Sequence, residues 1–315
     1  MLRYVFRRIV EALPTTVGVL VLSFVLFNVV GGSPAEVILG KNATAQSIAA
    51  FNHKFGYDKP LVLGERGSRL DSQFFNFVFD LARGDLGVST EYDEPVADVL
   101  ARGVGPSLSL TVPILVGGTV LALSLAMLCA AFRGGFADRA VLVGSTVLMS
   151  VNYVVWILAG QYLLAYRLRL FPVWGCESAA YLALPVLIGL FSSLGPDVRF
   201  FRAAVLDEVN RPYVRTAAAK GLSRARVLLR HVLPNSLIPI VTYVSLSIPF
   251  LFTGSLMLET FFGIPGLGNV SINAIHSSDM AVVRAVVVLG ALLYQIVNLA
   301  TDLVYAALDP RVRLG

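Results

Sequence analysis

Long runs of apolar residues that contain no Asp, Glu, Lys or Arg recur along the chain. A helix of about 20 such residues, rising 1.5 Å per residue, crosses the hydrocarbon core of a bilayer. The pattern therefore predicts an all-α membrane protein with six transmembrane helices, the last of which extends past its flanking charges. The six runs are residues 12–35, 103–132, 140–166, 178–196, 231–258 and 285–301.

A seventh uncharged run, residues 260–278, has a different pattern. It reads TFFGIPGLGNVSINAIHSS, so Gly, Pro, Asn or Ser interrupts the apolar residues every few positions. Such a backbone would leave unpaired polar groups in lipid. We expect a loop that folds back into the protein at membrane depth.

Between the first two predicted helices lies the only sizeable segment on the outer side, residues 31–105. Residues 71–83, DSQFFNFVFDLAR, predict a helix along the membrane interface, and residues 83–95, RGDLGVSTEYDEP, predict turns. We interpret this segment as a cap over the outer mouth. The predicted divisions are then the start and first helix (1–30), the cap (31–105), a five-helix core (106–308) with a cytoplasmic loop (198–235), and a tail (309–315).

Composition and charge support the membrane assignment and give its orientation. Charged residues make up 14% of the chain, against about 25% in soluble domains, and the mean hydropathy is +0.75. With the long segment 31–105 set aside, fifteen Lys and Arg lie on the side of the two termini and three on the other. The positive-inside rule places both termini in the cytoplasm. The net charge of +5 is therefore a topology signal and does not indicate nucleic-acid binding.

The cytoplasmic loop 198–235 predicts two short helices. In the first, Asn210 is a candidate N-cap, Pro212 suits the first turn, and Gly221 suits the C-terminal end. Val214, Ala217, Ala218 and Gly221 are spaced at i, i+3, i+4 and i+7, so we expect a small, smooth face that lets another protein approach closely.

The second predicted helix begins at Ser223. Its apolar positions are Ala225, Leu228, Leu229 and Val232, while Arg226 and Arg230 share another face. Leu233 and Pro234 are expected to break the helix just before the fifth membrane segment.

This loop resembles the cytoplasmic "EAA" loop of ABC-transporter permeases. The resemblance rests on the triplet Arg215-Thr216-Ala217, then Gly221, then Leu233-Pro234; Arg215 stands where the consensus has Glu, and Thr216 where it has the first Ala. RTAAAKGLS is similar to the dipeptide and oligopeptide branch, which includes nickel permeases. Three more stretches resemble that branch: GDLGVS (84–89), ETFFGIPGLG (259–268) and NLATDLVYAALDPRVR (298–313).

The resemblance implies a type I ABC importer permease fold in the bacterial inner membrane, with both termini cytoplasmic. This chain would form half of a translocation pathway with a second homologous permease, which makes a heterodimer. Two ATP-binding subunits would supply ATP hydrolysis with Mg²⁺, and an extracytoplasmic solute-binding protein would deliver peptide, nickel or another solute. The residues implied in ATPase coupling are Val214, Arg215, Thr216, Ala217, Ala218, Lys220, Gly221, Leu222, Leu233 and Pro234.

Polar residues inside the predicted helices are the candidates for contact with solute. We expect Asn152, Tyr153 and Gln161 to line the path, and Asn28 and Asn298 to act as hydrogen-bonding links between helices. The ETFFGIPGLG stretch has two open interpretations: a plain connector, or an outer lip that meets the delivery protein. The lip residues would be Glu259, Phe261, Phe262, Pro265 and Gly266.

Motifs for chemistry by this chain itself are absent from the sequence. It contains no G-x-x-x-x-G-K-[ST] phosphate loop, no H-E-x-x-H and no C-x-x-C pattern. We therefore expect a non-catalytic subunit with no cofactor, no metal site and no nucleic-acid partner. An ATP-independent channel or a secondary transporter remains the alternative class.

Overall fold

The computed structural model describes residues 2–30, 35, 39–40, 43–62, 71–253 and 255–308. Throughout these residues the chain is helical, apart from turns and one isolated bridge between Val88 and Pro95. The predicted all-α class is confirmed. The predicted tail 309–315 and parts of the predicted cap lie outside the described residues, and the predicted domain boundaries stay a prediction.

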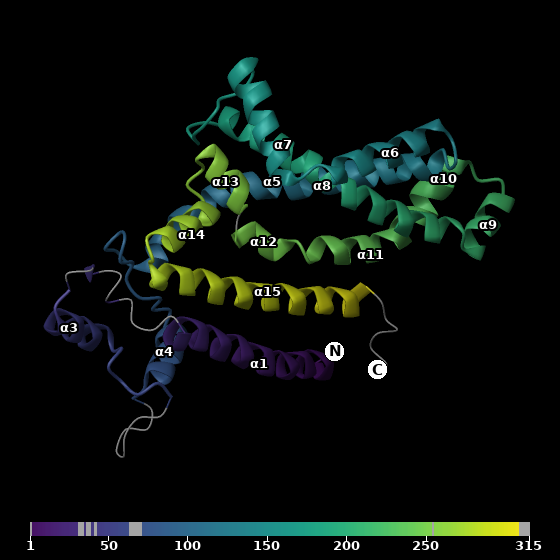
Figure 1. Ribbon diagram of the computed structural model, residues 1–315. Coiled ribbons are helices and arrows are strands. Elements are labelled where there is room, and N and C mark those ends of the chain that lie inside the picture. Colours follow the sequence, from purple (N-terminus) through teal and green to yellow (C-terminus); the bar gives the residue numbers. More distant parts are fainter. Residues whose placement is uncertain are drawn as a thin grey trace. The chain divides into compact units, whose positions relative to one another are not determined.

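The chain divides into two compact units, and the first comprises Met1–Gly105 with Gly266–Gly315. Its long helices are α1 (Leu2–Phe24), continued by the π-helical turn η1 (Val25–Val30), and α15 (Met280–Leu308). The two helices are packed against each other, and Thr16 Oγ1 donates a hydrogen bond to Gln295 Oε1 at 2.8 Å. Figure 1 shows the start of α1 and the end of α15 at the same end of this unit, as expected if both termini lie on one side of the membrane.

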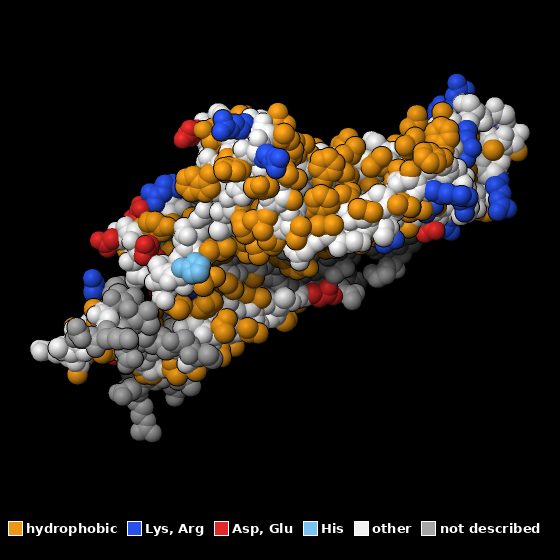
Figure 2. All heavy atoms as spheres, turned by 45° about the horizontal axis from the view of Figure 1, so that its top comes forward, with side chains coloured by type: hydrophobic (Ala, Val, Ile, Leu, Met, Phe, Trp, Pro, Cys, Tyr) orange, Lys and Arg blue, Asp and Glu red, His pale blue; other side chains and the backbone are white. Residues whose placement is uncertain are grey.

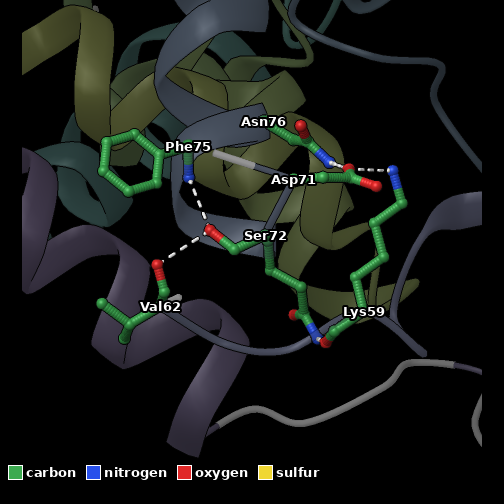
Figure 3. Close-up of polar contacts among 7 residues, drawn as sticks. Lys59, Val62, Asp71, Ser72, Phe75 and Asn76 are labelled. Carbon is green, nitrogen blue, oxygen red and sulfur yellow. Dashed lines mark hydrogen bonds and ion pairs between the residues drawn. The ribbon is translucent and has the colours of Figure 1, made fainter. Parts of the chain in front are cut away.

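The cap segment contributes two shorter helices to this unit, α3 (Ala45–Phe55) and α4 (Gln73–Ala82). The helix predicted over residues 71–83 is thus confirmed. Figure 3 shows how α4 begins: Ser72 Oγ accepts the Phe75 N–H at 3.4 Å and donates to the Val62 carbonyl at 2.9 Å. The hydrogen bond from Lys59 Nζ, 2.7 Å long, holds the pKa of the Asp71 carboxyl below its ordinary value.

Turns occupy residues 83–95, as the sequence predicts, and a buried carboxylate ties them to the second half of this unit. Asp279 lies between α14 (Leu267–His276) and α15 and is fully buried. Its Oδ2 accepts the Ser89 hydroxyl at 2.5 Å and the Thr90 N–H at 3.1 Å. In the same unit, Asn28 Nδ2 donates to Gln73 Oε1 at 3.2 Å, so Asn28 does link two segments.

The second unit, Pro106–Pro265, contains most of α5 (Val96–Ala131). With α5 lie α6 (Phe136–Ser150), α8 (Ala179–Val209) and α11 (Leu233–Ser245). Helix α8 packs on both α6 and α11. A hydrophobic core runs between them and includes Ala126, Phe201, Val205 and Ile240.

The run 140–166, predicted as one membrane helix, is a bent pair. Helix α6 meets α7 (Tyr153–Gly160) and its π-helical continuation η2 (Gln161–Arg167) at an angle of 92°. The bend arises because Val151 and Asn152 have extended backbones, and Asn152 Oδ1 then caps α7 by accepting the Val154 N–H at 2.9 Å.

By length and composition, four of the described helices can each cross a membrane: 96–131, 179–209, 224–245 and 280–301. The bent pair provides a fifth span if it counts as one, and residues Leu13–Val29 form a shorter apolar helix. Within the described residues, each of the six predicted runs contains helical structure, but the third is bent.

Two predicted boundaries after residue 230 are wrong. The run 231–258 is not one helix, because α11 ends at Ser245 and a separate helix, α12 (Ile248–Thr253), follows. The predicted loop 260–278 consists largely of two short helices, α13 (Leu256–Phe262) and α14. Their internal amide groups pair along each helix, and the Gly and Pro residues gather in the turn at Gly263–Gly266.

The surface of the second unit carries its charge at the ends. Figure 2 shows bands of hydrophobic side chains along the helices, and Lys and Arg gathered at the end where α9 and α10 lie in Figure 1. This distribution suits a protein whose middle faces lipid and whose basic end faces the cytoplasm.

Candidate functional site

The cytoplasmic loop forms a short helix, α9 (Pro212–Ala219), at one end of the second unit (Figure 1). Pro212 occupies its first turn as predicted, but the N-cap position is Arg211 and not Asn210, which ends α8 instead. The backbone turns at Gly221, whose φ of +81° lies in the left-handed region that favours glycine. The predicted end of the helix is therefore confirmed within two residues.

The residues of the small face predicted for this helix are partly buried in the protein core and partly exposed on its surface. Val214 and Ala217 are each only 7% exposed and belong to the core that also contains Val205 and Val227. They pack on the chain itself, so the small face is not exposed at these two positions, and their part in ATPase coupling stays a prediction. The outward side of the loop instead presents Arg215, Thr216, Ala218, Ala219, Lys220 and Gly221, while Leu222 is half-buried against the core.

Polar bonds fix both ends of α9 to the chain. Tyr213 donates its hydroxyl to Glu208 Oε2 at 2.5 Å, and burial followed by this hydrogen bond raises the pKa of Tyr213 to about 12. Beyond the helix, Arg224 Nη2 donates to the Ala130 carbonyl at 3.3 Å. Arg133 Nη1 donates to Asn210 Oδ1 at 2.9 Å. The loop is thus attached to the ends of α5 and α8.

The helix that follows does not break at Leu233-Pro234, so that prediction is wrong. Helix α10 (Arg224–Val227), the π-helical turn η3 (Leu228–Val232) and α11 form one continuous helix of 22 residues. Proline normally interrupts a helix because it lacks an N–H. Here the wider turn accommodates it: the Leu233 N–H bonds to the Leu228 carbonyl, five residues back.

The wide turn also shifts which residues of the second loop helix are buried. Ser223 is its N-cap residue as predicted, although its side chain makes no capping bond. Val227, Leu228 and Val232 face the core, whereas Leu229, predicted on the same apolar face, is 61% exposed. A period of 3.6 residues does not describe a π-helical turn, which explains the error.

An ion pair that the sequence did not single out holds α6 to α8 near this end. Asp138 and Arg202 form two bonds, at 2.7 Å (Nε–Oδ1) and 3.0 Å (Nη2–Oδ2). Asp138 Oδ2 also accepts the Gly134 N–H at 2.9 Å. Asp138 is almost fully buried, so the short turn 133–135 is anchored to two membrane helices.

A cavity of about 630 Å³ opens within the second unit. Four segments contribute to its wall: α5, the bend between α6 and α7, α8, and the stretch around α12. Its lining includes Thr111, Met149, Tyr153, Trp156, Ser192, Ser193, Asp197, Ser247 and Ser255. Tyr153 is thus the one predicted path residue in this lining.

The other two predicted path residues have local structural roles. Asn152 caps α7, as described above. Gln161 Nε2 donates to the carbonyls of Phe261 at 2.9 Å and Val173 at 3.0 Å, so its amide group links three segments. Neither side chain belongs to the cavity lining.

Asp197 is a carboxylate in the cavity that the sequence did not predict as a site. Tyr243 donates its hydroxyl to Asp197 Oδ1 at 3.0 Å, whereas the nearby Ser193 hydroxyl donates to the Leu190 carbonyl at 3.1 Å. The predicted membrane runs were defined as containing no charged residue. The fourth run therefore ends at residue 196, and Asp197 was placed outside the predicted membrane helix. In the structure it lies well inside α8.

The predicted outer-lip stretch is mostly buried in this chain, and the choice between a connector and a lip that meets the delivery protein stays open. Glu259 is 0% exposed, and its Oε1 accepts the Ser107 hydroxyl at 2.8 Å and the Ser255 N–H at 2.9 Å. Phe262 and Gly266 are buried, Phe261 is half-buried and Pro265 is exposed. The Phe262 carbonyl accepts the Gly175 N–H at 2.8 Å.

Comparison with known proteins finds matches to related families along nearly the whole chain. Residues 100–314 match the family described as binding-protein-dependent transport system inner membrane component, and residues 1–111 match its N-terminal family. The chain is 32% identical over 316 residues to the glutathione transport system permease protein GsiC of Escherichia coli O6:H1, covering 99% of each chain. It is also 32% identical over 318 residues to the probable peptide ABC transporter permease protein y4tP of Sinorhizobium fredii, covering 98% of this chain and 99% of that protein.

The helical architecture, the cytoplasmic loop that contains α9, and these matches lead to one conclusion. The chain belongs to the family of binding-protein-dependent transport system inner membrane components, the non-catalytic, multi-pass permease subunits of ABC transporters with the type I importer fold, in the bacterial inner membrane.

Proposed function

We propose that this chain forms half of the translocation pathway of an ATP-driven peptide importer. A second homologous permease completes the pathway, two ATP-binding subunits hydrolyse ATP with Mg²⁺ in the cytoplasm, and a solute-binding protein delivers the peptide from outside. The relatives named for glutathione and for peptide transport support a peptide substrate. The absence of a phosphate-loop motif from this sequence supports placing ATP hydrolysis in partner subunits.

The observation that carries the proposal is the division of α9 into an anchored side and a presented side. Val214 and Ala217 fasten the helix to the core, while Arg215, Ala218 and Lys220 are exposed. The free side combines the small side chains of Thr216 and Ala218, which let a partner approach closely, with the cationic Arg215 and Lys220, which can pair with acidic groups on that partner. The attachment of the loop to α5, α8 and α11 would carry a movement of that partner into the membrane helices.

Ala218→Glu tests the docking by enlarging and charging the presented side. We expect recovery of the ATP-binding subunits with the purified permease to fall about tenfold, equivalent to about 1.4 kcal/mol, and ATP-driven peptide uptake to fall with it. Thermal unfolding of the permease should change by no more than about 0.5 kcal/mol, because Ala218 is exposed. Assembly and uptake equal to wild type would contradict the proposal.

Two matched alanines separate docking from folding. Ala50→Glu introduces the same group on an exposed position of α3 and should leave recovery of the ATP-binding subunits unchanged. Ala217→Glu places the carboxylate on the buried side and should lower the permease's own free energy of unfolding by about 2 kcal/mol or more. If Ala217→Glu were as stable as Ala218→Glu, the assignment of the two sides would be wrong.

A further inference from the structure

The cavity of the second unit contains a carboxylate whose bonding capacity is incompletely used. Asp197 accepts the hydroxyl of Tyr243, a neutral partner, whereas a carboxylate has about four acceptor positions. Within the described chain, no Lys, Arg or His forms an ion pair with it. Arg199, two residues further along α8, bonds elsewhere, to Thr146 Oγ1 at 3.3 Å and Met149 Sδ at 3.8 Å.

A second polar group in the same wall, the Ser192 hydroxyl, has no hydrogen-bond partner within the described residues. Ser192 Oγ is buried and makes no hydrogen bond to any described part of the protein, and Ser192 lines the cavity together with Asp197. Buried polar atoms are nearly always paired, and a carboxylate inside a membrane helix is costly unless a cation or water balances it. The wall therefore presents negative charge and oxygen atoms to whatever enters.

The group that complements this wall is an ammonium, which carries one positive charge and three N–H donors. Tyr153 and Trp156 line the same cavity, and their rings can cover the carbon atoms next to such a cation or attract the cation through the ring face. The volume of about 630 Å³ lies within the range of pockets that hold small ligands. A dipeptide is of suitable size.

We propose that Asp197 is a substrate-binding residue that receives the ammonium group of the solute in transit. This inference rests on the proposed function, because it takes the solute to be a peptide. The free N-terminus of the peptide then supplies the ammonium group. Tyr243 positions the carboxylate, and Ser192 supplies a further oxygen when the solute enters.

The first test measures the attraction for a cation without any transported solute. Ser193→Cys, one helical turn from Asp197, is introduced into the assembled transporter after Cys129→Ala and Cys176→Ser. Its modification rates are measured with cationic aminoethyl methanethiosulfonate and neutral methyl methanethiosulfonate. Adding Asp197→Asn should lower the cationic-to-neutral rate ratio roughly 3- to 10-fold, as expected for a charge about 6 Å away in a partly hydrated site.

Asp207→Asn is the matched control, because Asp207 lies on the same helix but is exposed and outside the cavity lining. It should leave the rate ratio unchanged. A rate ratio that is the same with and without Asp197→Asn would overturn the proposal, and so would a cysteine that reacts with neither reagent, because the cavity would then be closed to solutes.

The second test measures uptake of labelled alanyl-alanine by the complete transporter. Asp197→Asn should reduce kcat/KM for uptake about tenfold or more, Tyr243→Phe by less, and Asp197→Glu should retain part of the activity because it keeps the charge. Unchanged uptake by Asp197→Asn would overturn the role of Asp197 in peptide transport. A wild-type transporter that imports no peptide would refute the proposed function instead, and the rate ratio would still decide whether Asp197 attracts a cation.

Discussion

Two short helices in the second unit, α9 and α13, are built alike but placed differently. Each follows a residue with extended backbone, Arg211 or Ser255, and each is followed by a glycine in the left-handed region, Gly221 or Gly263. The one charged residue of α9, Arg215, and the next residue after the helix, Lys220, are exposed, whereas the one charged residue of α13, Glu259, is completely buried. The same local design therefore serves once to present a surface and once to close a core.

Helices α9 and α13 therefore differ in whether their charged residue is buried, and not in their length or their end residues. Glu259 accepts hydrogen bonds from the Ser107 hydroxyl and the Ser255 N–H, while Arg215 and Lys220 remain in solvent. Substitutions in α13 should therefore act on folding, and substitutions on the free side of α9 on assembly.

Removal of the buried carboxylate should have the largest effect on stability. Glu259→Ala leaves the Ser107 hydroxyl and the Ser255 N–H without their acceptor, and each unsatisfied buried group costs about 1–3 kcal/mol. We expect the free energy of unfolding in detergent to fall by about 3 kcal/mol, measured by thermal or denaturant unfolding. Glu259→Gln keeps an acceptor oxygen and should lose less than half as much; equal stability of Glu259→Ala and wild type would refute the core role of α13.

The glycines that follow the two helices, Gly221 and Gly263, give a second test of the comparison between α9 and α13, with a smaller expected loss of stability. Both positions have positive φ, so alanine costs about 1 kcal/mol at each. At Gly263 an added Cβ would also overlap the indole ring of Trp174, whereas nothing lies near Gly221. We expect losses of about 2 kcal/mol for Gly263→Ala and about 1 kcal/mol for Gly221→Ala, in the same unfolding assay. Equal losses would show that the indole packing contributes nothing.

The smallest effect is expected at the anchor of α9, and it depends on pH. Burial, followed by the hydrogen bond to Glu208, raises the pKa of Tyr213 from 10 to about 12, so the stabilisation that requires the neutral phenol is complete below pH 10 and is lost as the pH rises to 12. Tyr213→Phe should cost less than about 1 kcal/mol at pH 7, because the side chain is partly exposed. The difference between wild type and variant should vanish as pH rises to 12; a constant difference would contradict this assignment.

Sequence reasoning was sufficient for features that depend on composition and local backbone chemistry. Uncharged runs located the helical regions, the cap residues 71–83 formed the predicted helix, and Pro212 and Gly221 marked the two ends of α9. These features follow from properties of single residues, such as the missing N–H of proline or the free φ of glycine.

The errors concern contacts between distant residues. An apolar face looks the same whether it meets a partner or its own chain, so the sequence did not show that Val214 and Ala217 would be buried. Glu259 gave no sign that Ser107, 152 residues away, would bury it. A rule that ends a membrane run at the first charge excluded Asp197 by construction.

The continuous helix from Arg224 to Ser245 has a mechanical consequence. Its 22 residues, at 1.5 Å each, make a rod about 33 Å long whose lower end begins three residues after Gly221. A continuous helix of this length could act as a lever: a tilt of about 10° at one end would displace the other end by about 6 Å over that length. Had Leu233-Pro234 broken the helix, the joint would have absorbed that motion before it reached the membrane.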